Sequence, residues 1–170
     1  MKVILVGYMA SGKTVVARRL AQLLNLRFVD TDKWIEARSC KTIPEIFSED
    51  GEHVFREIEK ECLEFLIDKD NMVIASGGGM PCFNKSIDLM VELGETVYLE
   101  ADVQTLVYRL WDEKSGRPII NNFHAIEDLH NFISKHLSER EEYYMKCNHI
   151  VSVDGKPVER IAEEIKRILL

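Results

Sequence analysis

The chain has 170 residues, of which 46% are hydrophobic and 30% charged, and its formal net charge is −7. This length suits a single domain spanning residues 1–170, and the composition is ordinary for a soluble globular protein. The negative charge argues against a nucleic-acid-binding or membrane-binding surface, because such surfaces rely on clustered Lys and Arg. An anionic ligand would therefore have to bind in a local pocket.

Short apolar runs rich in β-branched residues alternate with helical patterns along the chain. The candidate strands are residues 3–6, 27–29, 72–75, 96–99 and 149–153. Helical patterns cover residues 13–24 and 51–66, and a terminal helix carries an apolar stripe of Val158, Ile161, Ile165 and Ile168. This alternation predicts an α/β fold in three layers, with a five-stranded parallel sheet between two layers of helices.

The first strand leads directly into GYMASGKT, from Gly7 to Thr14, which matches the phosphate-loop pattern GxxxxGK[ST]. Gly7 and Gly12 allow the backbone to approach a polyphosphate closely, so that N–H groups and the next helix N-terminus face the anion. Lys13 would reach the β- and γ-phosphates, and the Thr14 hydroxyl would bind Mg²⁺. A plain glycine turn is the alternative, but it would need neither Lys13 nor Thr14.

Asp30 and Asp32 follow the second strand. Near a bound triphosphate, Asp30 could hold Mg²⁺ through water, while Asp32 could accept a hydrogen bond from an acceptor hydroxyl. The alternative for Asp32 is a helix N-cap or a first-turn acid. In open α/β sheets, ligands bind beyond the carboxyl ends of the strands, so these residues are expected to meet the phosphate loop in one crevice.

The helix at 51–66 carries an apolar stripe of Phe55, Ile58, Cys62 and Phe65. Arg56 lies off this stripe, and on its own it is interpreted as half of a solvated ion pair with Glu59. Gly77, Gly78 and Gly79 then follow the third strand. Three glycines in a row favour close approach of the backbone to a ligand over a plain tight turn.

Residues 112–123 are polar and contain Gly116, Arg117 and Pro118, which is typical of a mobile lid. A cation delivered from a closing lid would stabilise a transferring phosphoryl group, although Arg117 could equally be a surface residue. Arg140, among acidic residues, could be an exposed helical arginine. The sequence gives no acidic or metal-spaced partner for four histidines, which are interpreted as structural or solvated: His124, His130, His136 and His149.

The four cysteines form no CxxC pair and no zinc-finger spacing, and they are expected to be buried free thiols: Cys40, Cys62, Cys82 and Cys147. No apolar stretch reaches the length of a membrane span. A reducing, cytoplasmic location is therefore expected.

Six motifs occur together in the order and at the spacing of one family: GYMASGKT, Asp30-Thr31-Asp32, the stretch from Gly51 to Glu57, Gly77-Gly78-Gly79, Arg117-Pro118, and Arg140 followed by Tyr144. In this combination the chain resembles shikimate kinases over almost its whole length. The resemblance implies a P-loop kinase fold with a flexible lid at about 112–123. It also implies transfer of the γ-phosphate of ATP to the 3-hydroxyl of shikimate, in chorismate and aromatic amino-acid biosynthesis.

The resemblance further implies roles for individual residues. Lys13, Asp32 and Arg117 would be catalytic, and Thr14 and Asp30 would hold Mg²⁺. The residues expected to bind ATP are Gly7, Ala10, Ser11, Gly12, Lys13, Thr14, Val15, Arg109, Arg117 and Lys156. Those expected to bind shikimate are Asp32, Arg56, Gly77, Gly78, Gly79 and Arg140. No nucleic-acid or membrane partner is expected, and the chain is expected to be a monomer.

Ala10 departs from the family pattern, because a glycine often stands there. The glycines Gly7 and Gly12 are unaffected, so nucleotide binding is expected to survive. The alternatives are another small-molecule kinase of this fold, acting on gluconate or a nucleoside monophosphate, or a non-catalytic module that binds nucleotide or shikimate. The Phe55-Arg56 stretch, the triple glycine and Arg140 favour a compact carboxylated polyol as the acceptor. A working enzyme is favoured because Lys13, Asp32 and Arg117 are all present.

Overall fold

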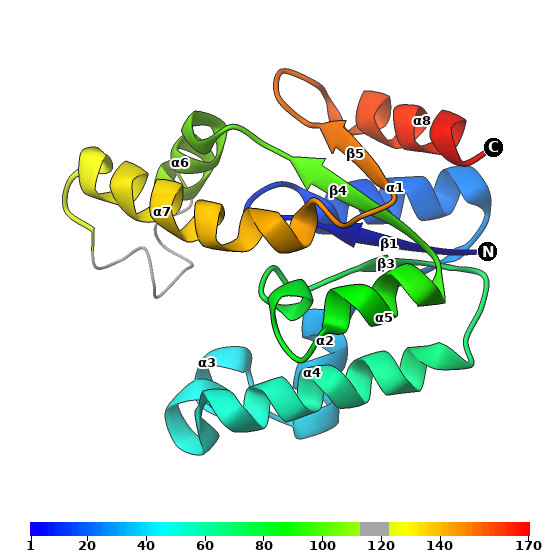
Figure 1. Cartoon of the computed structure of the whole chain (residues 1–170), viewed down its shortest axis with the longest axis horizontal. Helices are drawn as coiled ribbons and strands as arrows, with labels where there is room; N and C mark the ends of the chain where they lie inside the picture. Colours follow the sequence, from blue (N-terminus) through cyan, green and yellow to red (C-terminus); the bar gives the residue numbers. More distant parts are fainter. Residues whose placement is uncertain (113–122) are drawn as a thin grey trace.

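The computed structural model describes residues 1–112 and 123–170. Within these residues, five parallel strands form one sheet in the order β2-β3-β1-β4-β5. Figure 1 labels β1, β3, β4 and β5 of this sheet. The strands are β1 (Lys2–Val6), β2 (Arg27–Asp30), β3 (Met72–Ala75), β4 (Glu95–Glu100) and β5 (His149–Ser152). The expected five-stranded parallel sheet is confirmed.

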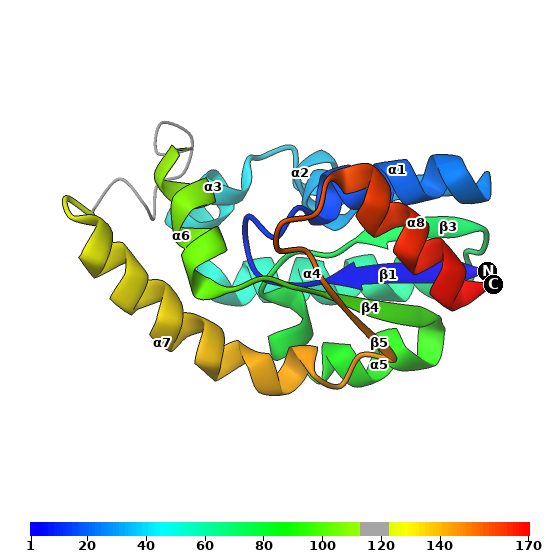
Figure 2. The same ribbon diagram turned by 90° about the horizontal axis from the view of Figure 1, so that it is seen from above.

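Helices cover both faces of this sheet. Seen from above, α1 and α8 lie together on one face, and α5 and α7 lie on the other (Figure 2). The helices are α1 (Lys13–Leu24), α2 (Thr31–Ser39), α3 (Ile43–Glu45), the π-helical turn η1 (Ile46–Asp50), α4 (Gly51–Ile67), the 3₁₀ turn η2 (Met80–Cys82), α5 (Ser86–Leu93), α6 (Val103–Asp112), α7 (Ile126–Tyr144) and α8 (Val158–Leu169). This is the three-layer α/β/α arrangement that the sequence predicts.

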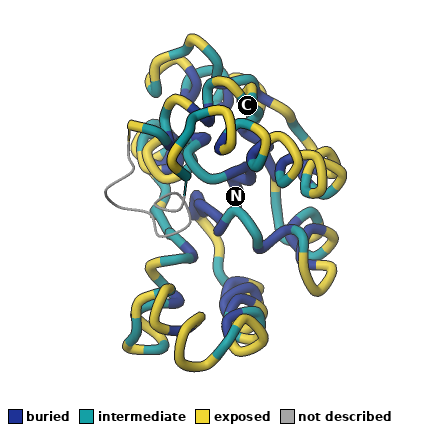
Figure 3. The backbone as a smooth tube through the Cα atoms, turned by 90° about the vertical axis from the view of Figure 1, so that its left-hand side faces the viewer, coloured by how far each residue is buried: buried dark blue, intermediate teal, exposed yellow. Residues whose placement is uncertain are grey.

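The central strands form the core, where buried residues gather between helices with exposed outer sides (Figure 3). All five residues of β1 are buried, because this strand has a neighbour on each side and helices on both faces. In the register of the sheet, Leu5 pairs with Ala75 on one side and with Val97 on the other. The segments that follow β1 and β3 therefore leave the same edge of the sheet, together with the end of β2, where Asp30 pairs with Ala75.

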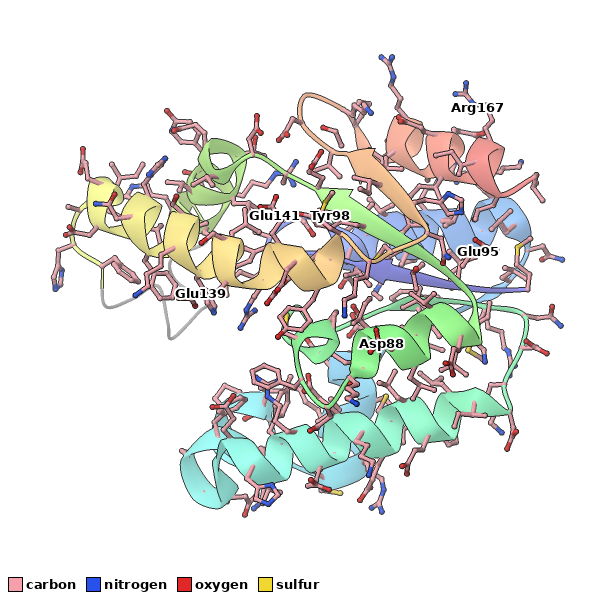
Figure 4. The ribbon with its side chains drawn as sticks, in the orientation of Figure 1. Asp88, Glu95, Tyr98, Glu139, Glu141 and Arg167 are labelled. Carbon is pink, nitrogen blue, oxygen red and sulfur yellow. The ribbon has the colours of Figure 1, made fainter. Side chains whose placement is uncertain are left out.

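The end of α7 packs on the sheet through two aromatic residues. The rings of Tyr98 on β4 and Tyr144 on α7 have centroids 5.1 Å apart. Tyr98 lies beneath α7 close to Glu141 (Figure 4), and burial and this carboxylate both raise the pKa of Tyr98. The contact fixes the end of α7 beside the loops at the carboxyl edge of the sheet.

Two predicted apolar stripes differ from the observed ones. Phe65 is 49% exposed, and the buried face of α4 instead consists of Phe55, Glu59, Cys62, Leu63 and Leu66. At 3.6 residues per turn, Leu66 returns to within about 20° of Phe55, whereas Phe65 lies about 80° away. On α8, Ile161 and Ile165 are buried, but Ile168, in the last turn, is 42% exposed.

The four cysteines are free, but only Cys62 and Cys147 are buried, so the expectation is wrong for Cys40, which is exposed, and for the half-buried Cys82. Cys40 ends α2 at the surface in a left-handed conformation. Over residues 1–112 and 123–170, none of the helices has the length and apolar character needed to cross a membrane.

Candidate active site

The phosphate loop joins β1 to α1, and three of its residues have positive φ angles. Gly7 has φ 151° and Gly12 has φ 94°. A Cβ on Gly7 would lie 2.8 Å from the carbonyl oxygen of Leu99, so a side chain there would force the loop off β4. Ala10 has φ 63°, which costs a residue with a Cβ about 1 kcal/mol. Glycine at position 10, which is common in the family pattern, would avoid this cost.

Lys13 and Ser11 point polar groups into this loop. The Lys13 ammonium donates to the carbonyl oxygens of Gly7 at 2.8 Å and Tyr8 at 2.9 Å, so its side chain runs back across the loop. The Ser11 hydroxyl is buried and has no hydrogen-bond partner within the described residues. The loop thus holds an ammonium group and a buried hydroxyl close together.

A cavity of about 440 Å³ opens above the loop at the carboxyl edge of the sheet. Its lining brings together the loop, the acidic residues after β2 and the start of the glycine run: Met9, Ala10, Ser11, Gly12, Lys13, Thr14, Val15, Val16, Asp30, Asp32, Ser76, Gly78, Arg109, Lys156, Val158 and Ile161. The expected convergence of these three segments on one crevice is observed. Gly77 and Gly79 of the glycine run, Arg56 on α4 and Arg140 on α7 are not among these lining residues.

Asp30 uses both carboxylate oxygens. One oxygen, Oδ1, caps α2 by accepting from the backbone N–H groups of Asp32 at 3.1 Å and Lys33 at 3.3 Å. The other, Oδ2, accepts from the Thr14 hydroxyl at 2.9 Å. The helix cap is therefore Asp30, so Asp32 is not the N-cap but lies in the first turn of α2.

Asp32 is a half-buried carboxyl close to the carboxylate of Asp30. Burial raises the pKa of Asp32 above its ordinary value of 3.8, the carboxylate of Asp30 raises it further, and the ammonium of Lys13 opposes the shift. The side chain lies against the glycine run, where a Cβ on Gly77 would come within 2.7 Å of Oδ1. A carboxyl with a raised pKa in a cleft is suited to proton transfer.

Arg56 is held on several sides and is not solvated, so its interpretation as half of a surface ion pair is wrong. Its side chain is 13% exposed, and Nη1 donates to Oε2 of Glu59 at 2.6 Å. Nε and Nη2 both donate to Oε1 of Glu52, at 3.2 and 3.0 Å. The guanidinium carbon lies 3.7 Å from the ring centre of Phe83. A Cβ on Gly79 would lie 3.1 Å from Nη1, so the glycine leaves room for this side chain.

Glu59 is not among the site residues predicted from the sequence. It is 3% exposed, and burial raises its pKa while the Arg56 guanidinium opposes that shift. A signal was present, because Glu59 stands four residues after Phe55 and three before Cys62 and so falls on the apolar stripe. A carboxyl on such a stripe needs a buried partner.

One face of α7 contacts both the phosphate loop and the glycine run at 77–79. The Arg140 guanidinium carbon lies 6.0 Å from the centre of the Tyr8 ring, and the Tyr144 hydroxyl donates to the carbonyl of Gly78 at 2.7 Å. Nδ1 of His136 lies 2.8 Å from the Tyr8 hydroxyl. His136 therefore has a hydrogen-bonding partner in Tyr8. His149 also has a partner, because its Nε2 lies 2.9 Å from Oε2 of Glu95. The sequence pattern revealed neither pair.

Two basic residues border the cavity on the side of α6 and α8. Nη1 of Arg109 donates to the carbonyl of Ala10 at 3.0 Å, which ties α6 to the phosphate loop. Lys156 forms an ion pair with Glu164 at 2.8 Å. Arg117, Gly116 and the core of the expected lid lie outside the described residues.

A phosphate loop at the carboxyl edge of a parallel sheet, with the half-buried Asp32 lining the same cavity, is typical of a P-loop phosphotransferase that acts on a small molecule. The family model for shikimate kinase matches residues 9–170. A shikimate kinase from Flavobacterium psychrophilum is 41% identical over 170 residues, covering 99% of this chain and 98% of the relative. One from Flavobacterium johnsoniae is 39% identical with the same coverage. The chain belongs to the shikimate kinase family.

Solved structures agree with this assignment. The crystal structure of shikimate kinase from Bacteroides thetaiotaomicron matches with a TM-score of 0.92 and 34% identity, covering 99% of this chain and 98% of that chain. Shikimate kinase from Acinetobacter baumannii in complex with shikimate matches with a TM-score of 0.87 and 30% identity, covering 99% of this chain and 92% of that chain. The protein is accordingly an ATP-dependent kinase that acts on an alcohol group.

Proposed function

We propose that this enzyme transfers the γ-phosphate of ATP to the 3-hydroxyl of shikimate, giving shikimate 3-phosphate and ADP, in aromatic amino-acid biosynthesis. The observation that carries the proposal is that Lys13 of the phosphate loop and Asp32 line the same cavity. Membership of the shikimate kinase family and a relative solved with shikimate support the choice of acceptor. The acceptor oxygen forms the new bond to the γ-phosphorus, and the bond to the bridging oxygen breaks as ADP leaves.

The donor side of the site is the phosphate loop. The backbone from Gly7 to Thr14 offers N–H groups and the N-terminus of α1 to the phosphates. The buried Ser11 hydroxyl fits this role, because a phosphate oxygen would satisfy it. Lys13 would turn from the loop carbonyls toward the transferring group, assisted by Arg117. Ala10, Gly12, Val15, Arg109 and Lys156 would complete the nucleotide contacts.

Mg²⁺ would be held by Thr14 and Asp30. Their side chains already meet at 2.9 Å on the border of the cavity, and oxygen ligands suit this ion. Within the described residues, no group of three or more His, Cys, Asp and Glu could hold a metal ion alone. This fits Mg²⁺, which usually keeps water and substrate phosphates as its remaining ligands. The ion would neutralise charge on the phosphates.

The acceptor side would be formed by Asp32, Arg56, Arg140 and the glycine run at 77–79. Arg56 and Arg140 would bind the carboxylate of shikimate, since the guanidinium fork suits that anion. Asp32 would accept the hydrogen bond of the reacting hydroxyl and receive its proton. Because the transition state of phosphoryl transfer is loose, little deprotonation is needed before attack, so orienting the hydroxyl is the larger part of this role.

We further propose that the chain works as one domain in the cytoplasm, as a monomer, without nucleic-acid or membrane partners. A continuous hydrophobic core that includes residues from β1, α4, α7 and α8 supports the single domain. The net charge of −7 supports the lack of nucleic-acid and membrane partners.

The proposal is tested by a coupled ADP-release assay with ATP and Mg²⁺ against four acceptors, which are shikimate, quinate, gluconate and AMP. Turnover is expected with shikimate, and the product should carry phosphate on the 3-hydroxyl by NMR. Turnover of gluconate or AMP without turnover of shikimate would contradict the proposal. ADP release that does not depend on any acceptor would indicate a simple ATPase.

A further inference from the structure

The phosphate loop has a side-chain connection to α7. Tyr8, the residue after Gly7, is 1% exposed, and its hydroxyl lies 2.8 Å from Nδ1 of His136. The two rings meet edge to face, with centroids 5.5 Å apart. Phe132 packs on the other side of the imidazole, at 5.1 Å between centroids. The contact is therefore partly buried, with aromatic rings packed against the imidazole.

Proton positions in this pair follow from its surroundings. Burial raises the pKa of Tyr8 to about 12, so its hydroxyl keeps its proton at neutral pH. Burial and the Arg140 guanidinium lower the pKa of His136, so its imidazole stays neutral. The Tyr8 hydroxyl then donates to Nδ1, and the imidazole proton stands on Nε2.

The backbone of Tyr8 is part of the phosphate loop. Its carbonyl oxygen accepts from the Lys13 ammonium at 2.9 Å and from the backbone N–H of Ser11 at 3.2 Å. Tyr8 thus links the backbone that holds Lys13 to a side chain of α7.

On α7, His136 belongs to a row of residues four apart. His136, Arg140 and Tyr144 share one helix face, because side chains at i and i+4 lie above one another. Arg140 lies over the Tyr8 ring, with its guanidinium carbon 6.0 Å from the ring centre, and Tyr144 bonds to the carbonyl of Gly78. This face therefore touches the phosphate loop at one end and the glycine run at the other, with Arg140 between them.

We propose that Tyr8 and His136 are positioning residues, whose hydrogen bond sets Arg140 at a fixed distance from the phosphate loop and so aligns the acceptor with the transferring phosphate. The inference rests on the proposed function, since Arg140 matters only if the acceptor carries an anionic group. Neither residue touches the reacting atoms. A small shift of α7 would misplace the acceptor, and rates of aligned reactions are sensitive to such shifts.

The test compares three variants with the wild type in steady-state kinetics, using ATP, Mg²⁺ and shikimate. Tyr8→Phe removes the hydroxyl and keeps the ring. His136→Phe removes the acceptor nitrogen and keeps the aromatic packing, while His136→Asn places an amide oxygen near the position of Nδ1. Tyr8→Phe and His136→Phe should each lower kcat/KM for shikimate about fivefold, as expected for one neutral hydrogen bond. The KM for ATP should stay within about twofold, and His136→Asn should recover most of the loss.

The double variant Tyr8→Phe/His136→Phe should be no worse than either single variant, because both remove the same bond. His130→Phe, on the same helix but lining a different hollow with α6, serves as the matched control and should leave kcat/KM unchanged. Losses that add in the double variant, or an unchanged kcat/KM in Tyr8→Phe despite a lower melting temperature, would overturn the positioning role. A wild type that does not phosphorylate shikimate would overturn the proposed function and this inference together, whereas an active wild type with unaffected variants overturns this inference alone.

Discussion

Oδ1 of Asp32 lies 2.7 Å from the point that a Cβ atom on Gly77 would occupy. The carboxyl thus rests on a residue that has no side chain, while Gly77 itself donates its backbone N–H to the Thr31 hydroxyl at 2.8 Å. Gly77 is held in place by that bond and cannot easily move away. The first glycine of the run therefore determines where the carboxyl of Asp32 can lie.

Gly77→Ala is expected to lower kcat strongly while leaving the KM for ATP close to that of the wild type. The added methyl group must displace the Asp32 carboxyl, and misplacement of a catalytic group by about 1 Å can cost about a hundredfold in rate. Steady-state kinetics with shikimate and ATP measure the effect. Gly79→Ala is the comparison, because its methyl group would lie 3.1 Å from Nη1 of Arg56 and would not meet Asp32. It should mainly raise the KM for shikimate, and a Gly77→Ala enzyme with normal kcat would contradict the role given to Asp32.

Asp32→Asn is expected to stabilise the protein and to lower kcat by a factor of about 100 or more. The raised pKa of Asp32 means that the fold disfavours the charged carboxylate. Stability from this group is therefore present below its ordinary pKa of 3.8 and is lost as the pH rises through the raised value. The neutral amide avoids that loss.

Thermal unfolding followed by circular dichroism measures the expected gain in stability of Asp32→Asn. The melting temperature of Asp32→Asn should exceed that of the wild type at neutral pH, and the difference should shrink in acid, where the wild-type carboxyl takes up a proton. A melting temperature below that of the wild type at neutral pH would mean that Asp32 stabilises the fold instead.

Asp30→Asn is expected to raise the Mg²⁺ concentration needed for half-maximal activity by about tenfold or more. The amide oxygen can still cap α2, so the fold should keep its stability, but the negative charge beside Thr14 is lost. A titration of activity against Mg²⁺ measures the shift. Asp30→Ala removes the cap as well and should cost about 1 kcal/mol of stability, which separates the two tasks of this residue. An unchanged Mg²⁺ requirement in Asp30→Asn would argue against the proposed metal site.

Glu52→Gln is expected to lower the KM for shikimate. The Glu52 carboxylate accepts from Nε and Nη2 of Arg56 and so competes with an incoming carboxylate for one edge of the guanidinium. Because Glu52 is 57% exposed, this ion pair is weak, and the gain should be at most about fivefold. Glu59→Gln should have the opposite effect, since it removes the buried charge that orients Arg56. Binding of shikimate followed by calorimetry distinguishes the two, and weaker binding in Glu52→Gln would show that both acids orient Arg56.

The stability of the wild type should depend on pH through His136. Burial lowers the pKa of His136 from its ordinary value of 6.5, Arg140 lowers it further, and Glu139 opposes the shift; the uncharged hydroxyl of Tyr8 faces the ring from the phosphate loop. The neutral imidazole therefore stabilises the fold above pH 6.5, and this stability is lost as the pH falls through the lowered value. Urea unfolding from neutral pH to about pH 5 should show a steeper loss for the wild type than for His136→Asn. Parallel curves for the two proteins would contradict the prediction.

The phosphate loop and the sheet that carries it could be predicted from the sequence alone. The residues from Gly7 to Thr14 are contiguous, and a strand before them and a helix after them fix their conformation, so a local pattern was sufficient. The bounds of α1 and β3 also agree with the prediction, because their apolar periodicity reflects contacts with neighbouring elements on fixed faces.

The surroundings of Arg56 and the link between the phosphate loop and α7 could not be predicted, because they depend on how whole elements pack against one another. Arg56 and Glu59 were interpreted as a solvated pair, because the periodic pattern placed the burial boundary of α4 one residue away from where packing sets it. Tyr8 and His136 are 128 positions apart, and neither residue type indicates a contact with the other. Local patterns report the faces of single elements, whereas a buried polar pair exists only when two elements dock in one relative position.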